Sequence, residues 1–415
     1  MCSLRVILLF TLIILSPSTL LAAQPLGWDN IADAAQQSFE DGPEKALRME
    51  VDSLKAQRSL LPNRVMDVHA STIAQIPLTS SAKQNAQHQI QAGASFILGS
   101  LPSHMETLLE TQIQSEQAHN QSKKLAYFEQ LLNAYASWWQ ASLKYEHITQ
   151  DVLRAHQDSE PLRQAFESGS YAELDWLDLE VALAALSREE LLASDEQSLA
   201  LQQLQVLIDQ ESWTPTITEL HEDNLFTSNP WETLLERVQN HPTIIALDHQ
   251  ASVLRAQANV EQHLYPTTLS LDAGWTGIAP STHWSYVEAS ISIPLSNPGK
   301  AEAARKRIQA NSVEQEKLWQ IELLRREILS QITRYNTLLH NLEQLTQGEL
   351  ATLHKRQTLL EDGFKQKQVT LARVLQGRRD LHEASHHKLE LLLQLQVHTI
   401  LATQLNTWIT SAQIK

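Results

Sequence analysis

Four short segments of the chain alternate apolar and polar residues with a period of two. They cover residues 65–74, 89–98, 268–276 and 285–295. In the third segment, for example, Leu269, Leu271 and Ala273 alternate with Ser270 and Asp272. This pattern is typical of a strand with one apolar and one polar face, so each segment predicts a β-strand. Its length suits a strand that crosses a membrane, although a half-buried hairpin of a soluble protein has the same period.

Long stretches between these segments carry apolar residues at steps of three and four. Residues 104–160 and 172–209 predict two helices in the first half of the chain, and residues 298–362 and 370–415 predict two in the second. One seam in the third stretch consists of Ile321, Leu324, Ile328, Tyr335, Leu338, Leu342 and Leu345. A mean step of 3.5 residues indicates helices that pack as a coiled coil.

The chain repeats its own plan with an offset close to 200 residues. Residues 166–177 match residues 364–375, and each half has a helix, two alternating segments and two long helices. Residues 24–211 are therefore predicted to form a first structural repeat and residues 230–415 a second. Residues 212–229, which contain Pro215 and Asn229, predict the linker between them.

Composition supports a mainly helical chain. Only 11 glycines and 14 prolines occur in 415 residues, and tight turns need both. An all-β or loop-rich fold is therefore excluded, while 42% hydrophobic residues are enough for a large core.

The N-terminal residues and the charge indicate an exported protein. Residues 1–23 have a basic start at Arg5, an apolar run and a small-residue end at Ala22 and Ala23, which predicts a cleaved signal peptide. Cys2, the only cysteine, lies within it, so the mature chain is expected to have no disulfide. A net charge of −16 argues against nucleic acid or anionic lipid headgroups as main partners.

Four membrane strands cannot close a barrel, because membrane barrels begin at about eight strands and lipid tolerates no open edge. If the four segments cross a membrane, the chain must oligomerise. A dimer with eight strands and a trimer with twelve both satisfy this requirement.

The whole plan resembles the TolC-like outer-membrane efflux family. Four places carry the resemblance: residues 240–243 (Asn-His-Pro-Thr), residues 265–269, residues 291–300 with Pro294 and Gly299-Lys300, and the tip motif Phe166-x-x-Gly169-x-x-x-x-Leu174-Asp175-x-Leu177. The second copy of the tip departs from the motif, with Lys367 in place of Gly and Arg373 in place of Asp.

The resemblance implies a mainly α fold with a small β part. Long coiled-coil hairpins would form an α-barrel, and four transmembrane strands per protomer of a homotrimer would form one β-barrel. It places the chain in the outer membrane of a Gram-negative cell, in contact with its lipid, with most residues in the periplasm. A periplasmic membrane-fusion (adaptor) protein and an inner-membrane transporter of the RND or ABC type would be its partners.

Little in the sequence points to catalysis. Nucleophile elbows, phosphate-binding loops and dinucleotide fingerprints are missing, so no enzyme and no cofactor is expected. His382-Glu383-x-x-His386 matches a zinc-protease string, and His382 and His386 are weak metal candidates. Its place on a long amphipathic helix favours a solvated helix face. A zinc hydrolase is the corresponding minor alternative.

The two predicted hairpin tips carry opposite charges. The first tip has Asp158, Glu160, Glu167, Glu173, Asp175, Asp178 and Glu180, and the second has Lys365, Lys367, Arg373, Arg378 and Arg379. Pairs of Asp175 or Asp178 with Arg373 or Arg378 are predicted to hold an entrance closed, although two independently solvated surfaces would show the same charges. The remaining tip residues are interpreted as packing or adaptor-docking positions: Gly169, Leu174, Leu177, Val374 and Leu375.

These observations predict the exit duct of a tripartite efflux pump. Seventeen histidines and an acidic chain favour heavy-metal cations as substrates over drugs. The exit duct of a type I protein secretion system and a soluble periplasmic coiled-coil adaptor or structural protein are the alternatives.

Overall fold

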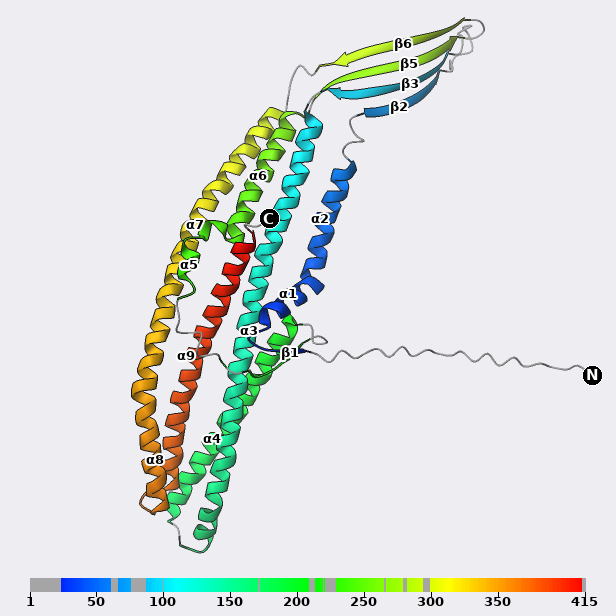
Figure 1. Ribbon diagram of the computed structural model, residues 1–415. Coiled ribbons are helices and arrows are strands. Elements are labelled where there is room, and N and C mark those ends of the chain that lie inside the picture. The colour runs from blue at the N-terminus through cyan, green and yellow to red at the C-terminus, as the bar shows by residue number, and fades with distance from the viewer. Residues whose placement is uncertain are drawn as a thin grey trace, which may run out of the picture.

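The computed structural model describes residues 24–60, 66–75, 87–98, 100–170, 172–208, 213–218, 220, 229–264, 266–278, 282–293 and 299–412. It has an elongated layer of long helices with a small sheet at one end (Figure 1). The predicted signal peptide and most of the predicted linker, residues 212, 219 and 221–228, lie outside the described residues.

Helices dominate both halves. The first half contains α1 (Ile31–Asp41), α2 (Pro43–Leu60), α3 (Leu101–Glu167) and α4 (Glu173–Leu207). The second half contains α5 (Glu232–Leu235), α6 (Pro242–Gln262), α7 (Gly299–Gln344), α8 (Ala351–Lys365) and α9 (Leu371–Ala412). The predicted mainly helical fold is confirmed. Among the described residues, none of the helices is long and apolar enough to cross a membrane.

The predicted helix 298–362 contains one irregularity. A π-helical turn, Leu345–Leu350, joins α7 to α8. Leu342, Leu345 and Leu350 are all buried, and the last two are five residues apart. An ordinary α-helix would turn Leu350 away from the seam, so the wider turn keeps it in the core.

The sheet consists of β2 (Met66–Gln75), β3 (Gln87–Leu98), β5 (Thr267–Ile278) and β6 (Thr282–Ser292), in the order β2-β3-β5-β6. All three ladders are antiparallel and run without a break. The register pairs Ala92 with Ala273 and Ala273 with Val287. Because side chains alternate along a strand, this register places the apolar residues of neighbouring strands on one face.

That apolar face is uncovered in the single chain. The exposed fractions of its large side chains are Ile90 53%, Leu271 45%, Trp275 39%, Val287 83% and Ile291 63%. Such a continuous apolar surface is unusual for a water-soluble protein.

The opposite face of the sheet is polar and crowded. A Cβ atom on Gly93 would lie 1.9 Å from the Oδ1 atom of Asp272, and one on Gly274 would lie 2.5 Å from the ring of Tyr286. These two glycines therefore make room for the side chains of the neighbouring strands. Ser270 and Ser290 contact each other on the same face, with 2.6 Å between their hydroxyl oxygens.

A second, small sheet lies beside the middle of α3. β1 (Gln24–Leu26) and β4 (Trp213–Pro215) pair in parallel. Beside them, Trp28 packs edge-on against Tyr135 and Trp139 of α3, with ring centroids 4.6 Å and 5.9 Å away. The Tyr135 hydroxyl donates to the Thr216 carbonyl at 2.8 Å, and Trp139 Nε1 donates to the Thr218 carbonyl at 2.9 Å. The segment between the two halves is thus fixed to α3.

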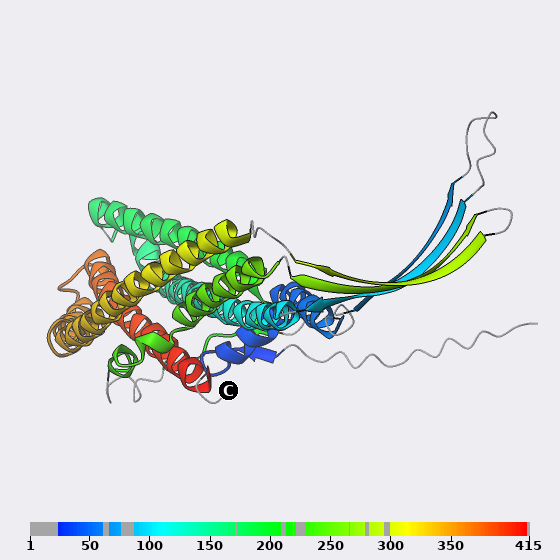
Figure 2. The same ribbon diagram turned by 90° about the horizontal axis from the view of Figure 1, so that it is seen from above.

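The helices form a layer with two free edges (Figure 2). Near the sheet the order is α2, α3, α6, α7. Farther from it α4 and α9 both pack against α3 and also contact each other, and α8 packs against α9. One edge therefore consists of α2 and α4, and the other of α7 and α8. β2 follows α2 and β6 precedes α7, so the outer strands belong to the same two sides. We propose that the halves are copies of one repeat, divided as the sequence predicts.

Acidification is expected to weaken the start of α6. His241 is 8% exposed, and its Nδ1 accepts a hydrogen bond from the Thr243 amide at 3.3 Å as the N-cap. Burial lowers the pKa of His241 to about 4. In the unfolded chain the pKa of His241 is near 6.5, so the unfolded chain binds a proton at a higher pH than the folded chain does. The contribution of His241 to the free energy of unfolding is therefore fully present above pH 6.5 and is lost as the pH falls towards 4. The expected slope is roughly 1.4 kcal/mol per pH unit.

Denaturant titrations at pH 7.5, 6, 5 and 4 measure this effect. His241→Asn is the matched control, because Asn caps helices well and does not titrate in this range. The slope should be shallower in the variant, and equal slopes would show that His241 is not responsible.

Candidate functional site at the helical hairpin tips

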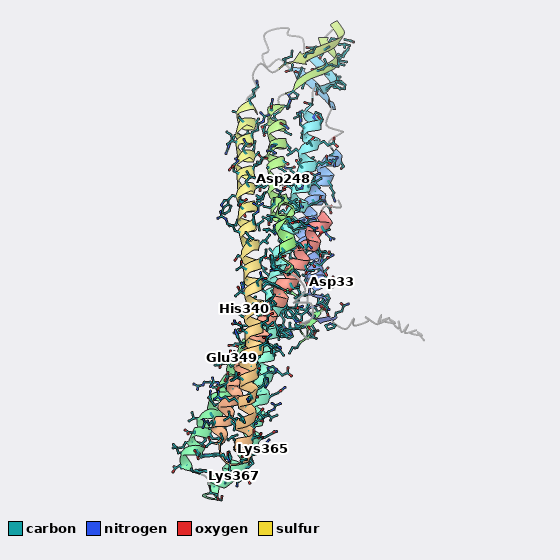
Figure 3. All side chains as sticks on the ribbon, turned by 60° about the vertical axis from the view of Figure 1, so that its left-hand side comes forward. Asp33, Asp248, His340, Glu349, Lys365 and Lys367 are labelled. Atoms are coloured by element: carbon teal, nitrogen blue, oxygen red, sulfur yellow. The ribbon has the colours of Figure 1, made fainter. Side chains whose placement is uncertain are left out.

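Both long helical hairpins turn at the end of the molecule opposite the sheet (Figure 1). The first turn joins α3 to α4, and the second joins α8 to α9. Lys365 and Lys367 mark the second turn in Figure 3. The two tips that the sequence singles out therefore lie at the same end of the layer.

The two tips stop their first helix in the same way. Gly169 has φ +72°, and Lys367 has φ +60°. The Ser170 amide donates to the Ala165 carbonyl at 2.8 Å and the Gly169 amide to the Phe166 carbonyl at 2.9 Å. Equivalent bonds occur at Gln368 and Lys367, with the same two lengths. This is the Schellman ending, which places its left-handed residue just after the helix.

Lys367→Gly is expected to stabilise the second tip by about 1 kcal/mol, because glycine adopts the left-handed region without the clash of a Cβ atom. Gly169→Ala, at the equivalent position of the first tip, should destabilise by a similar amount. Urea titration followed by circular dichroism measures both. A loss of stability in Lys367→Gly would contradict the conformational argument.

A small hydrophobic core lies directly behind the tips. Its buried members come from α3, α4 and α9: Ala155, Leu179, Leu371, Val374 and Leu375. Phe166 and Trp176 stack across the first turn, with ring centroids 5.2 Å apart and planes within 8° of parallel. The core joins the two hairpins into one body.

The four apolar tip residues predicted for packing or docking divide into two pairs. Val374 and Leu375 are 1% and 6% exposed and belong to the tip core. Leu174 and Leu177 are 71% and 49% exposed on α4. Only the exposed pair is available to a partner.

Arg378 links the two hairpins, but through partners other than the predicted ones. Its Nη1 donates to Asp158 Oδ2 of α3 at 2.8 Å, and its Nε lies 3.4 Å from Glu361 Oε1 of α8. Arg379 adds a 3.7 Å contact with Glu189 of α4. Arg378 pairs with Asp158 because α3 and α9 pack antiparallel. This packing places the turn of α9 that carries Arg378 beside the turn of α3 that carries Asp158.

Asp175, Asp178 and Arg373 do not meet within one chain. Asp175 lies in the first turn of α4, where a carboxylate complements the helix dipole, and Arg373 is exposed on α9. In the part of the chain that the structure describes, none of the three forms an ion pair. The predicted gate involving these residues stays a prediction.

In the histidine string on α9, His382 contacts α3. His382 Nδ1 lies 3.4 Å from Asp151 Oδ2, and the His382 ring centroid is 5.5 Å from that of His147 and 6.4 Å from that of His386. His382 and His386 are partly buried, whereas Glu383 and His387 are exposed, so the predicted solvated face includes only part of the string.

Burial lowers the pKa of His382, although Asp151 acts in the opposite direction, and burial also lowers the pKa of His386. Among the described residues, no three histidine, cysteine or acidic side chains are placed to hold a metal ion. An open groove of about 770 Å³ runs beside this cluster, and its polar lining includes Lys144, Glu189, Glu349, Glu383, His386 and Glu390.

Two exposed apolar stripes run along the edges of the layer, and neither was predicted from the sequence. The α4 stripe is Leu174, Leu177, Val181, Leu192, Leu199 and Val206, and the α7/α8 stripe is Ile308, Leu318, Trp319, Leu329 and Leu359. A signal was present, because α4 has leucines on more than one face, including the buried Leu179 and Leu204.

No protein-family model matches the sequence, and no curated protein matches it either. Solved structures do match. CusC, from a study of transmembrane channel formation, is 14% identical with a TM-score of 0.74, covering 93% of this chain and 95% of that chain. The outer-membrane channel OprN is 16% identical with a TM-score of 0.69, covering 91% of each chain.

The outer membrane protein VceC from Vibrio cholerae is 13% identical with a TM-score of 0.67, covering 92% of this chain and 96% of that chain. At these identities the likeness establishes the fold, and it extends over almost the whole length of each protein. The chain therefore has the TolC-like fold of outer-membrane channels, as its sequence predicted.

Proposed function

We propose that this protein is the outer-membrane exit duct of a tripartite efflux pump. The observation that carries the proposal is the uncovered apolar face of the sheet, with Val287 83% exposed and Ile291 63% exposed. A lipid bilayer covers such a face, while the polar face, with Asp272 and Ser270, suits a wet lumen.

The free edges of the sheet call for further copies of the chain. β2 and β6 each have one neighbour in the described sheet. Unpaired strand edges are not tolerated in lipid, so β6 of one copy would pair with β2 of the next. The likeness to known channels favours three copies and twelve strands over two copies and eight.

The edges of the helical layer support the same arrangement. The α4 stripe and the α7/α8 stripe lie on opposite edges, so one copy would offer its α4 stripe to the α7/α8 stripe of its neighbour. A contact between two different surfaces generates a ring when the rotation closes. The helices would then continue the lumen across the periplasm.

The tips would form the entrance to this duct. Arg378, bound to Asp158 and Glu361, would hold the hairpins together in the closed state. Asp175, Asp178 and Arg373 are free to pair across the boundary between copies. The exposed Leu174 and Leu177, the members of the α4 stripe nearest the tip, would dock the periplasmic adaptor, while the rest of the stripe contacts the neighbouring copy. The adaptor in turn would contact an inner-membrane transporter of the RND or ABC type.

Heavy-metal cations are the proposed substrates, on the strength of the acidic chain and its 17 histidines. Type I protein secretion would use the same duct with another pump, and remains the second candidate. A soluble adaptor is disfavoured, because the apolar face of the sheet would then be left in water.

Fractionation and gene deletion test the proposal. The protein should be recovered with outer membranes and change its gel mobility on heating, and its deletion should sensitise cells to metals in a panel that also contains drugs and dyes. Recovery with soluble periplasmic contents would overturn the duct. Sensitivity to drugs alone would overturn the metal substrate and leave the duct in place.

A further inference from the structure

Three polar contacts, here called the ladder, join α6 to α7 at regular intervals. Lys317 Nζ donates to Asp248 Oδ1 at 2.6 Å, and Asp248 is labelled in Figure 3. Arg255 pairs with Glu314 as the second contact. Arg307 Nη2 donates to Gln262 Oε1 at 2.6 Å as the third contact, nearest the sheet. Consecutive contacts lie about two turns apart on α6, as expected for one face of a helix.

A notch opens between the second and third contacts. It has a volume of about 340 Å³ and is lined by Arg255, Asn259, Arg307 and Asn311. Each lining side chain carries N–H donors, and no carboxylate lines the notch. The short Asn side chains at this level leave the space that longer side chains would fill.

The charge at the notch is incompletely neutralised. Arg255 has Glu314 as its carboxylate partner, whereas Arg307 is bound to the neutral amide oxygen of Gln262. Within the described residues, Arg307 forms no ion pair. Lys300 lies seven residues before Arg307, hence on the same face of α7, and is exposed. A positively charged cavity stands out in a chain of net charge −16.

We propose that this notch binds a phosphate group. Two guanidinium groups from different helices, with two amides between them, supply the forked donors that tetrahedral oxyanions prefer. Each guanidinium has five N–H donors, and the ladder contacts of Arg255 and Arg307 run through the Nη2 nitrogen. The remaining donors can face the ligand without breaking the ladder.

The position of the notch indicates two sources for the phosphate. Arg307 lies eight residues into α7, about 12 Å from its first residue, and α7 begins at the end of the layer next to the sheet. Helical side chains tilt towards the N-terminus, so Arg307 reaches towards the sheet. A lipid headgroup is one source, and this assignment rests on the proposed function, because it needs the chain to lie in a membrane. A soluble phosphate is the other source, and that assignment does not depend on the proposed function.

Calorimetric titration of the full-length protein in an uncharged detergent tests the site. The probes are sodium phosphate and dihexanoyl-phosphatidylglycerol, with sodium chloride at equal ionic strength as the reference. Arg307→Gln should weaken phosphate binding at least tenfold. Arg305→Gln is the matched control, because Arg305 is exposed nearby on α7, contacts Glu302 of its own helix and does not line the notch.

Saturable binding of one phosphate per chain that Arg307→Gln weakens and Arg305→Gln leaves unchanged would support the site. Tighter binding of the lipid would identify a headgroup as the source, and equal or tighter binding of inorganic phosphate would identify a soluble one. No saturable binding of either probe, or equal binding by wild type and Arg307→Gln, would overturn it. Binding in detergent requires no conducting channel, so this failure would leave the proposed duct standing.

Discussion

Arg378→Glu is expected to shift the equilibrium of the proposed duct towards its open state by at least tenfold, seen as higher single-channel conductance in planar bilayers. Arg378 is mostly buried, with 28% of its side chain exposed, and it contacts Asp158 at 2.8 Å and Glu361 at 3.4 Å. Charge-assisted contacts of this kind are worth about 1.5–3 kcal/mol. The substituted carboxylate would also repel both partners, so the two hairpins should separate.

Arg356→Glu provides the matched control. Arg356 contacts Asp380 at 2.8 Å, but this pair joins α8 to α9 within a single hairpin. Its loss should leave the conductance close to that of wild type. The exchange Asp158→Arg with Arg378→Glu should restore the closed state in part, because the new carboxylate regains a cationic partner on α3 but still lies beside Glu361. Equal conductance of Arg378→Glu and wild type would show that this contact does not hold the entrance closed.

Tyr135→Ala is expected to lower the free energy of unfolding by about 3–5 kcal/mol, the usual cost of removing a large buried ring. Tyr135 is 0% exposed, and its ring centroid lies 4.6 Å from that of Trp28. Its hydroxyl donates to Thr216, and burial raises the pKa of Tyr135 to about 12. The substitution should therefore loosen both the aromatic cluster and the segment between the two halves.

Tyr135→Phe separates these two contributions. It keeps the ring and removes only the hydroxyl, so the expected loss is about 1–3 kcal/mol, the cost of leaving the Thr216 carbonyl without its donor. Urea titration in detergent, followed by circular dichroism, measures both variants. A loss below 1 kcal/mol in Tyr135→Ala would contradict the assigned role of this cluster.

The elements themselves could be predicted from local pattern. Period-two alternation located all four strands of the larger sheet, with bounds within three residues of those in the structure. Steps of three and four located the long helices. The tip motif predicted the turn at Gly169, and the internal repeat located Lys367 as the equivalent residue. The left-handed backbone of Lys367 is not suggested by its residue type. These features depend on residues that are close together in the sequence, so the local pattern of residues is enough to predict them.

Contacts between distant segments could not be predicted. Nothing near Arg378 in the sequence indicates Asp158, which is 220 positions away, because the pairing depends on how α3 and α9 align. His382 was interpreted as part of a solvated face because its contacts, Asp151 and His147, lie on α3, far away in the sequence. The π-helical turn and the exposed α4 stripe were missed because a leucine seam looks alike whether it packs within a chain or between copies.

Single-particle electron cryo-microscopy of the full-length protein, extracted from outer membranes in detergent, would show whether copies of the chain form the proposed duct. We expect a threefold assembly in which the α4 stripe of each copy packs against the α7/α8 stripe of the next, around a continuous lumen. We also expect β6 of each copy to pair with β2 of its neighbour. A monomer, or an assembly that leaves both stripes and the apolar face of the sheet in water, would contradict the proposed duct.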